Sequence, residues 1–388
     1  LFTHNEEVFM NIRQSFNRAL LGAVCGALLL VSPASAAEKK IVMRYSHSSS
    51  AMVKEPHHAA ALDFKNYVEK ATNGKVDVQI YPGSQLGGEE RSFQDIQQGV
   101  IQIASLAVNN VTVFSPSMGV FDLPYMFTNY EDCYKLIDQN WDEINKRMID
   151  ESGNMAVGWL VQGFRVLSNS KHPIRTVEDL KGLKIRVPNN PIMIATFRAW
   201  GGEPAPMAWD ETFNALQQKV VDGQENPYPV FASNKFEEVQ KYITEIHYKV
   251  WIGPIVVNAA WLKRQPEDVQ KAILEGGRLA TENNRKMIAE METELVKALK
   301  DKGVEILDKP EDENIWEEKA MALWPDLYPK IGNLDLLDKM MADMNRKLTG
   351  IETVILFTEP PLAAISSSVV RDLISHGLDV SEFLPKNK

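Results

Sequence analysis

The pattern that most limits the fold of this chain is an alternation of strand-like and helix-like segments that begins near residue 41. Residues 41–46 and 76–81 alternate apolar and polar side chains as β-strands do, and residues 58–71 between them show helical spacing. Further strands are predicted at 101–108, 155–161, 183–187 and 250–257, and further helices at 89–99, 131–150, 191–200 and 209–219. Repeated strand–helix–strand units predict an α/β fold with mostly parallel sheets.

A very long helical pattern runs from Pro266 to Lys302 and is interrupted only by Gly276-Gly277. A helix of this length is too long for one small domain, so we predict that it packs along two lobes and braces them. Because the sequence contains no low-complexity linker, strands that cross between the lobes must join them, as in a hinged clamp. Ligands of such proteins bind in the crevice at the carboxyl ends of the strands.

Residues 10–36 have the pattern of an export signal. Two arginines precede the apolar residues 19–31, and Ala34-Ser35-Ala36 provides the small residues of a cleavage site. The alternative is a membrane anchor, but this apolar stretch is shorter than the roughly 20 residues that span a bilayer. We therefore predict cleavage after Ala36 and export to the periplasm, and we interpret residues 1–9 as extra residues upstream of the natural start.

Composition and motifs exclude several classes of function. The formal charge of −10 gives no general attraction for nucleic acid or anionic lipid, so no nucleic-acid partner is predicted. Two cysteines cannot make a disulfide framework or a four-cysteine metal site, and Cys133 is predicted to be a small buried apolar group. The sequence lacks the GxSxG, P-loop, GxGxxG and HExxH motifs, and the adjacent His57 and His58 diverge on a helix. No catalytic residue, metal or cofactor is therefore predicted, and the protein is expected not to be an enzyme.

Four segments carry a resemblance to a known family. They are YPGSQLGGEE (81–90), GFRVLSNS (163–170), LKGLKIRVPNNP (180–191) and ALQQKVVDGQENP (215–227). In this order and spacing they make residues 41 to 334 resemble the DctP-type solute-binding proteins of tripartite ATP-independent periplasmic (TRAP) transporters. The resemblance implies two α/β lobes, a hinge, and a cleft that closes on an organic acid. We place lobe I at 37–161 and 251–292, and lobe II at 162–250 and 293–334.

The same resemblance implies that Arg186, in KIRVP, forms the main ion pair with the ligand carboxylate. Physical chemistry agrees, because a guanidinium matches a carboxylate with two parallel hydrogen bonds and stays protonated. Arg186 also alternates with the apolar Ile185 and Val187, so it points to the opposite face of its strand. Arg165 resembles the second cleft arginine of the family, with a salt bridge at the hinge as the alternative.

Several further residues are candidates for ligand contact. Asn226 resembles the residue that hydrogen-bonds the same carboxylate, with stabilisation of the turn before Pro227 as the alternative. Trp209 falls where family members place an aromatic side chain against the ligand, with core packing as the alternative. Secondary candidates are His47, Gln85, Glu89, Tyr228 and Trp251. Residues 106–109 contain no carboxylate where some acid-sugar binders have one, which counts against the sialic-acid branch and weakly against other polyhydroxy ligands.

The last fifty residues resemble a different protein. MNRKL, IETV, ISSSVVR and HGLDVSEFLP occur here in the order found at the C-terminal end of phosphopantetheine adenylyltransferase. The catalytic histidine motif and phosphate-binding loop of that enzyme have no counterpart, so the fragment cannot position a phosphate for attack. We interpret residues 335–388 as an inert adenylyltransferase-like fragment, with a strand at 352–357 and a helix at 366–375.

The predicted function is that of an extracytoplasmic receptor that binds a small organic acid and delivers it to the membrane subunits of a TRAP transporter. The alternatives are a periplasmic enzyme acting on an organic acid, or a fusion that keeps an adenylyltransferase-related role through its tail. A monocarboxylate with an aromatic or keto group suits Trp209, while a C4-dicarboxylate and a sugar acid stay open as ligands. Membrane contact is expected only through the transporter.

Overall fold

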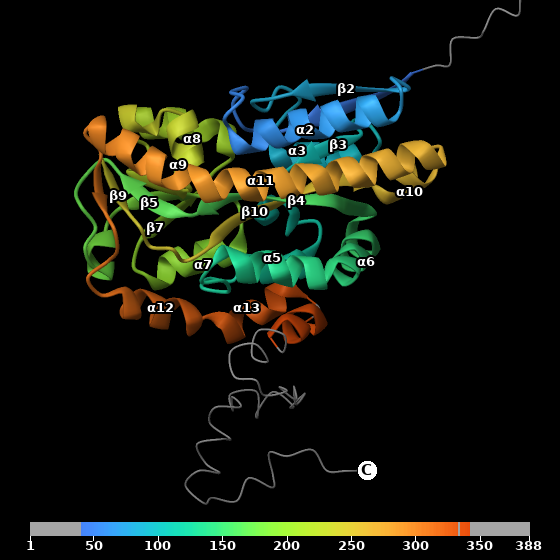
Figure 1. Ribbon diagram of the computed structural model, residues 1–388. Helices are drawn as coiled ribbons and strands as arrows, with labels where there is room; N and C mark the ends of the chain where they lie inside the picture. Colours follow the sequence, from blue (N-terminus) through green and yellow to red (C-terminus); the bar gives the residue numbers. More distant parts are fainter. Residues whose placement is uncertain (1–39, 333, 342–388) are drawn as a thin grey trace, which may run out of the picture. The chain divides into compact units, whose positions relative to one another are not determined.

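The computed structural model describes residues 40–332 and 334–341 (Figure 1). The chain divides into two compact units after Ile41, and the fold described below belongs to the unit that begins at Val42. The predicted export signal lies outside the described residues. So does the adenylyltransferase-like tail, apart from the helical residues 335–341.

Two mixed β-sheets form the centre of the fold. The first has the strand order β2-β1-β3-β10-β4, with strands β1 (Ile41–Ser46), β2 (Val76–Tyr81), β3 (Ile103–Ser105), β4 (Asn154–Phe164) and β10 (Val250–Asn258). The second has the order β11-β9-β5-β8-β6-β7, with strands β5 (Val166–Asn169), β6 (Lys184–Val187), β7 (Glu203–Pro206), β8 (Gly223–Asn226), β9 (Tyr242–Thr244) and β11 (Glu305–Leu307). The sheets fall largely within the ranges given above for the two lobes, whose limits stay a prediction.

The prediction of mostly parallel sheets is confirmed only in part: the pairs β1–β3, β6–β7, β6–β8 and β9–β11 are parallel, but the strands around β10 and β5 are not. Strand β10 is antiparallel to β3 and β4, and β5 is antiparallel to β8 and β9. Both strands enter their sheet directly from a strand of the other sheet, so neither follows the helical crossover that makes neighbouring strands parallel.

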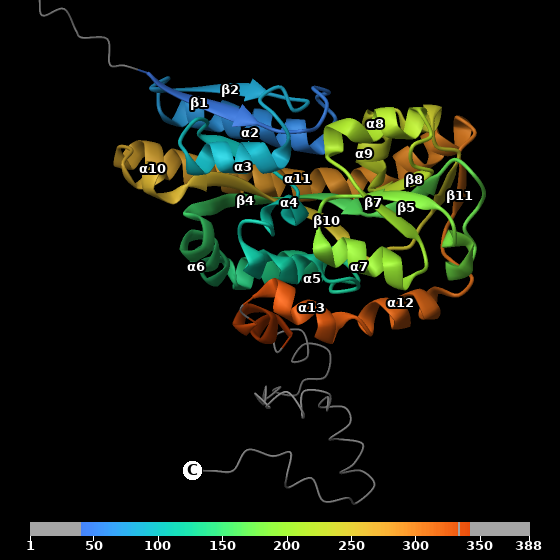
Figure 2. The same ribbon diagram turned by 180° about the vertical axis from the view of Figure 1, so that it is seen from behind.

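Helices cover both sides of the sheets (Figures 1 and 2). One side carries α2 (Pro56–Ala71), α8 (Trp209–Gln217), α9 (Tyr228–Ser233) and α11 (Glu267–Asp301). The other side carries α3 (Glu89–Gln97), α5 (Tyr130–Gln139), α6 (Trp141–Ser152), α7 (Pro191–Ala199), α12 (Glu313–Met321) and α13 (Trp324–Ile331). The short helices are α4 (Val108–Val111) and α10 (Ala259–Lys263), together with the 3₁₀ segments η1 (Pro116–Asp122), η2 (Val177–Leu180) and η3 (Phe236–Glu238). The helix predicted at 131–150 is divided into α5 and α6 because Asn140 leaves helical geometry.

Three segments connect the two sheets. The chain passes from β4 to β5 at Arg165 and from β9 to β10 through residues 245–249, and the two crossings touch where the Arg165 N–H donates to the Lys249 carbonyl at 2.9 Å. The third connection is α11, which runs through 35 residues without a break. The predicted long helix is thus confirmed.

Gly276 and Gly277 do not interrupt α11, contrary to the sequence pattern, but allow it to lie against β4. A Cβ atom at Gly277 would fall 2.0 Å from the Val157 carbonyl oxygen, so any larger residue would push the helix off the strand. The Asn284 side chain then accepts the Val161 N–H at 2.7 Å and donates to the Val161 carbonyl at 3.0 Å. These bonds satisfy backbone groups of β4, which lies at the edge of its sheet.

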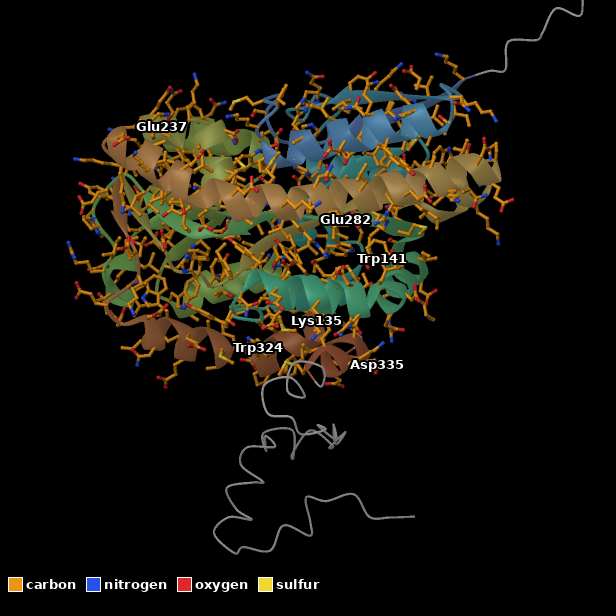
Figure 3. All side chains as sticks on the ribbon, viewed as in Figure 1. Lys135, Trp141, Glu237, Glu282, Trp324 and Asp335 are labelled. Atoms are coloured by element: carbon orange, nitrogen blue, oxygen red, sulfur yellow. The ribbon has the colours of Figure 1, made fainter. Side chains whose placement is uncertain are left out.

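The apolar core extends from the first sheet to α13. Trp324 of α13 is largely buried in this core, and its indole N–H donates to the Pro124 carbonyl at 3.1 Å (Figure 3). Cys133 is fully buried in the same core, as predicted. Within residues 40–332 and 334–341, no helix is both long and apolar enough to cross a membrane.

Candidate functional site

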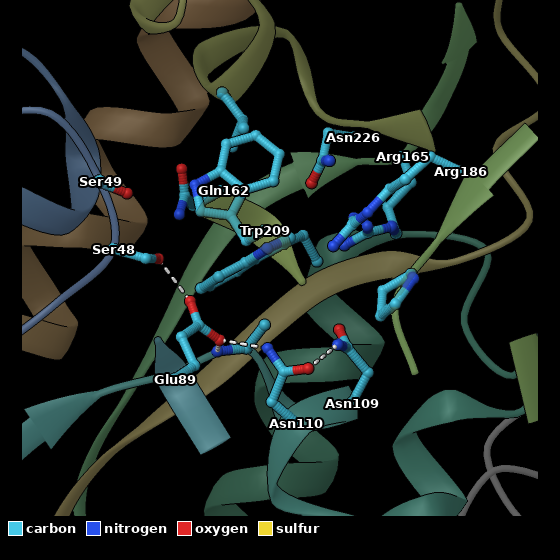
Figure 4. A pocket seen from close by; sticks show the side chains of 14 residues that line it. Ser48, Ser49, Glu89, Asn109, Asn110, Gln162, Arg165, Arg186, Trp209 and Asn226 are labelled. Atoms are coloured by element: carbon cyan, nitrogen blue, oxygen red, sulfur yellow. Dashed lines mark hydrogen bonds between the residues drawn. The ribbon is translucent and has the colours of Figure 1, made fainter. Parts of the chain in front are cut away.

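A pocket is lined by residues from both sheets and from the segments next to their strands, and it lies at the carboxyl end of β6 (Figure 4). The space between its side chains, including the part open to solvent, measures about 370 Å³. Its lining residues are Ser48, Ser49, Glu89, Ala107, Asn109, Asn110, Gln162, Arg165, Arg186, Pro188, Trp209, Asn226, Val230 and Trp251.

Arg186 is buried in this pocket and forms no ion pair with any carboxylate of the described residues. Its Nε and Nη2 atoms donate to the Met207 carbonyl at 3.1 and 2.8 Å, and its guanidinium carbon lies 5.7 Å from the centre of the Trp209 ring. Burial lowers the pKa of Arg186 to about 10, so the side chain stays protonated at neutral pH. A buried positive charge held only by a carbonyl and a ring is a ready partner for an anion.

Arg165 lines the same pocket, but its charge is already balanced. It makes a two-pronged contact with Glu225, through an Nε–Oε2 hydrogen bond and an Nη2–Oε1 hydrogen bond of 2.7 Å. The Tyr248 hydroxyl also donates to Glu225 at 2.8 Å. Burial alone would lower the pKa of Arg165, but the charge and hydrogen bonds of Glu225 raise it above its usual value. This geometry is that of the alternative given above, a salt bridge where the chain crosses between the sheets.

The structure brings most of the candidate residues together. Arg186, Arg165, Asn226, Trp209, Glu89 and Trp251 all line the pocket. Asn226 donates from Nδ2 to Gln224 Oε1 at 2.8 Å. Three secondary candidates do not line the pocket. Gln85 is exposed, and His47 is buried outside the pocket lining. Tyr228 is also buried, and its hydroxyl donates to Glu245 at 2.6 Å. The contact of each lining residue with a ligand stays a prediction.

Opposite Arg186 is a set of hydrogen-bonded polar residues that we call the polar wall: Ser48, Glu89, Asn109 and Asn110 (Figure 4). The Glu89 carboxylate accepts hydrogen bonds from the Ser48 hydroxyl at 2.5 Å, the Ala107 N–H at 2.8 Å and Asn110 Nδ2 at 2.5 Å. Asn109 in turn donates from Nδ2 to Asn110 Oδ1 at 2.9 Å. These contacts hold an acidic, oxygen-rich surface across the pocket from the guanidinium.

Comparison with known proteins identifies the family of this chain. Residues 47–330 match the family described as bacterial extracellular solute-binding protein, family 7 (DctP). The chain belongs to this family. The match confirms the predicted resemblance to DctP-type proteins, which are binding proteins.

Solved structures of TRAP periplasmic solute-binding proteins have the same fold. One from Rhodobacter sphaeroides, in an apo open form, is 42% identical, with a TM-score of 0.66 over 78% of this chain and 98% of that one. Another, from Sulfurospirillum deleyianum with bound succinate, is 32% identical, with a TM-score of 0.72 over 78% of this chain and 99% of that one. The 2,3-diketo-L-gulonate-binding periplasmic protein YiaO of Escherichia coli K12 is 29% identical over 265 residues, or 68% of this chain and 80% of that protein.

Some pocket residues of this DctP-family protein were not singled out in the sequence. Asn109, Asn110 and Gln162 line the pocket without any motif that marks them. The available signal for the two asparagines was their place a few residues after the buried strand β3, at the end of the strand where ligand-contacting residues gather in α/β proteins.

Behind the pocket wall lies a cluster of three buried histidines. His57 and His58 diverge as predicted, but both approach His47: His58 Nδ1 lies 3.0 Å from His47 Nε2, and the His57 and His47 ring centres are 5.4 Å apart. His57 also meets the Ser49 hydroxyl at 3.1 Å. Burial lowers the pKa of His47 to about 3 and that of His57 well below its usual value, whereas burial raises the pKa of the adjacent Glu55 to about 8. Within the described residues, no three histidine, cysteine or acidic side chains are placed to hold a metal ion.

This cluster should contribute a loss of stability as the pH falls from 7 to 5. His247 contributes in the opposite sense, because burial alone would lower its pKa but the neighbouring Glu245 raises that pKa. In the unfolded chain the histidines of the cluster have a pKa of about 6.5, so they take up protons below that pH, whereas in the folded protein they stay neutral. Each proton that only the unfolded chain binds lowers the free energy of unfolding by about 1.4 kcal/mol per pH unit. Glu55 acts in the opposite sense, because its raised pKa lets the folded protein keep a proton that the unfolded chain releases above about pH 4.5. The histidines of the cluster outnumber it, so the net contribution of the cluster is a loss.

Chemical unfolding at pH 7 and pH 5 measures this effect. The variant carrying His47→Gln and His57→Gln should lose less stability between the two pH values than the wild type. His172→Gln, at an exposed histidine, should behave like the wild type. Equal pH dependence in the wild type and the double variant would show that the cluster does not set it.

Proposed function

We propose that this protein is an extracytoplasmic receptor that binds a small organic acid and delivers it to the membrane subunits of a TRAP transporter. The observation that carries the proposal is Arg186, a buried guanidinium in a polar pocket that forms no ion pair with a described carboxylate. Leaving a buried charge unpaired is costly, and a ligand carboxylate would remove that cost.

The relatives support a carboxylate as the ligand. Succinate is bound in the Sulfurospirillum deleyianum structure, and YiaO is a 2,3-diketo-L-gulonate-binding protein; both of these compounds carry a carboxylate. In this chain the carboxylate would lie on Arg186, with Asn226 beside it and Trp209 against the carbon chain. An indole presents a broad apolar face that can pack on such a chain.

The polar wall favours hydroxyl groups at the far end of the ligand. The Glu89 carboxylate, Asn109 and Asn110 supply acceptor oxygens there, and hydroxyls can donate to them. A second ligand carboxylate would face Glu89 and be repelled. We therefore propose a hydroxylated monocarboxylate rather than a C4-dicarboxylate.

Closure of the two predicted lobes would follow binding. A ligand that bridges Arg186 and the polar wall binds the closed form better than the open form, and this difference in affinity shifts the protein toward closure. Export after cleavage at Ala36 would place the receptor in the periplasm, where the transporter's membrane subunits can take over the ligand.

A thermal-shift screen of the purified protein against organic acids tests the proposal. At about 100 times its Kd, a ligand stabilises the folded state by about 2.7 kcal/mol, which should raise Tm by about 4 °C for a folded part of roughly 300 residues. Hydroxylated monocarboxylates should give larger shifts than their dicarboxylate or deoxy analogues, and the amides of the same acids should give none. A screen in which no carboxylate raises Tm, or in which amides act equally well, contradicts the proposal.

A further inference from the structure

A buried asparagine four residues after Arg186 links the pocket's two sides. Asn190 is fully buried and is the N-cap of α7, where its Oδ1 accepts the N–H groups of Ile192 and Met193, both at 3.0 Å. Its Nδ2 donates in the other direction, to the Asn109 carbonyl at 3.1 Å and to Asp122 Oδ2 at 2.8 Å. Both ends of the amide are therefore used, one toward α7 and one toward α4 and η1.

The bond to Asn109 reaches the polar wall itself. Asn109 donates to Asn110, Asn110 donates to Glu89, and Glu89 accepts from Ser48 (Figure 4). On its other side, Asn190 is two residues from the pocket-lining Pro188, in the segment that leaves β6. Asn190, three residues beyond the end of the Arg186 strand, is thus hydrogen-bonded to the backbone of Asn109, a residue of the wall opposite Arg186.

The bond to Asp122 holds this link in place. Asp122 also accepts the Thr112 hydroxyl at 2.8 Å and forms an ion pair with Lys249, and all three side chains are buried. Lys249 lies next to β10, in the crossing between the sheets, and its carbonyl accepts the Arg165 N–H. Asn190 is therefore fixed to the crossing segment as well as to the polar wall.

We propose that Asn190 is a positioning residue of the ligand site, which sets the spacing between Arg186 and the polar wall; this inference rests on the proposed function of the pocket. An acid held at its carboxylate by Arg186 and at its hydroxyls by the wall tolerates only a small error in that spacing. Asn190 touches neither end of the ligand. It acts through the Asn109 carbonyl on one side and the start of α7 on the other.

The substitution Asn190→Ser separates the two roles of the amide. Serine keeps an oxygen that can cap α7, but it has no amide to reach the Asn109 carbonyl and Asp122. Asn190→Asp is a second variant of nearly the same shape, which also keeps the cap; its ionised form cannot donate and is repelled by Asp122. Asn190→Ala removes both roles and serves as the comparison for a purely structural effect.

Two measurements on the full chain test the inference. The first is hydrogen exchange without ligand: in the serine and aspartate variants, amides 110–115 should exchange at least about 5-fold faster than in the wild type, while the Ile192 and Met193 amides keep their protection. The second is the Kd for D-erythronate and for butyrate, which has the same four-carbon chain without hydroxyls. The serine variant should bind D-erythronate at least about 10-fold more weakly and butyrate less than about 3-fold more weakly, because only the former uses the wall.

The outcomes separate this inference from the proposed function. Unchanged exchange at residues 110–115 in both variants overturns the positioning role, as does an equal loss of affinity for both acids. If wild-type protein binds no acid in the screen above, the proposed function fails, and the exchange comparison alone then decides whether Asn190 orders the wall. If only the alanine variant differs from the wild type, Asn190 is a helix cap and the inference is wrong.

Discussion

Replacing Arg186 by alanine is expected to weaken the binding of an organic acid by at least about 2 kcal/mol, or roughly 30-fold in Kd. The side chain is 3% exposed, and within the described residues its guanidinium directly contacts only the Met207 carbonyl and the Trp209 ring. A carboxylate brought into the pocket of the alanine variant would lose its water shell and gain no positive partner. Titration calorimetry with the acid that gives the largest thermal shift measures the loss.

Two further arginine substitutions make this result specific. Arg186→Lys keeps the charge but loses the planar fork, so its Kd should lie between those of the wild type and the alanine variant. Arg198→Ala removes an exposed arginine from the nearby helix α7 and should leave Kd unchanged. Unchanged affinity in Arg186→Ala, with the fold intact by circular dichroism, would remove Arg186 from its assigned role.

The parts of the fold that the sequence predicts well are those specified by local pattern. The bounds of β1 and β2 agree with the strands predicted at 41–46 and 76–81, and α11 runs through the long helical pattern. Side-chain alternation and helical spacing are properties of consecutive residues, so they can be recognised without knowing which other segments pair or pack with the element.

The parts that were missed depend on distant segments. Strand β8 has the sequence GQEN, which contains no apolar residue, yet all four residues are buried because β5 and β6 pair with it on either side. Strands β9 and β11 are three residues each and pair with one another from far apart in the chain. Runs this short carry too few residues to show a period.

The site divides in the same way. Arg186, Asn226 and Trp209 were reached through segments that resemble a family, and the fold places them around one pocket. Of the polar wall, Glu89 was a secondary candidate, since an acidic residue also suits a helix start, and the two asparagines belong to no motif. Likewise, the sequence shows only that His57 and His58 diverge on one helix. The cluster also needs His47, which directly follows β1 and comes close to both only in the folded chain.

A second large effect is expected on stability when Glu225 is replaced by alanine. Arg165 and Glu225 are 2% and 0% exposed, so the substitution leaves a guanidinium buried without its counter-charge and the Tyr248 hydroxyl without its acceptor. Breaking a buried pair from one side costs about 3–5 kcal/mol, most of it the penalty of the remaining charge. Denaturant unfolding without ligand should show a loss of this size.

The double variant Arg165→Met with Glu225→Leu separates two contributions to the lost stability. One is the loss of the ion pair, and the other is the penalty for the stranded charge, that is, the guanidinium of Arg165 left buried without a partner. If the stranded charge dominates, the double variant recovers most of the stability, since well-packed apolar residues can replace a buried ion pair. In Glu225→Ala alone, an organic acid should raise Tm more than in the wild type, because the anion then faces two guanidinium groups that lack a carboxylate partner. Wild-type stability in the single variant, or a double variant as unstable as the single one, would show that Glu225 does not balance Arg165. A smaller thermal shift in the single variant would place the charge of Arg165 beyond the reach of the ligand and leave Arg186 as the pocket's effective cation.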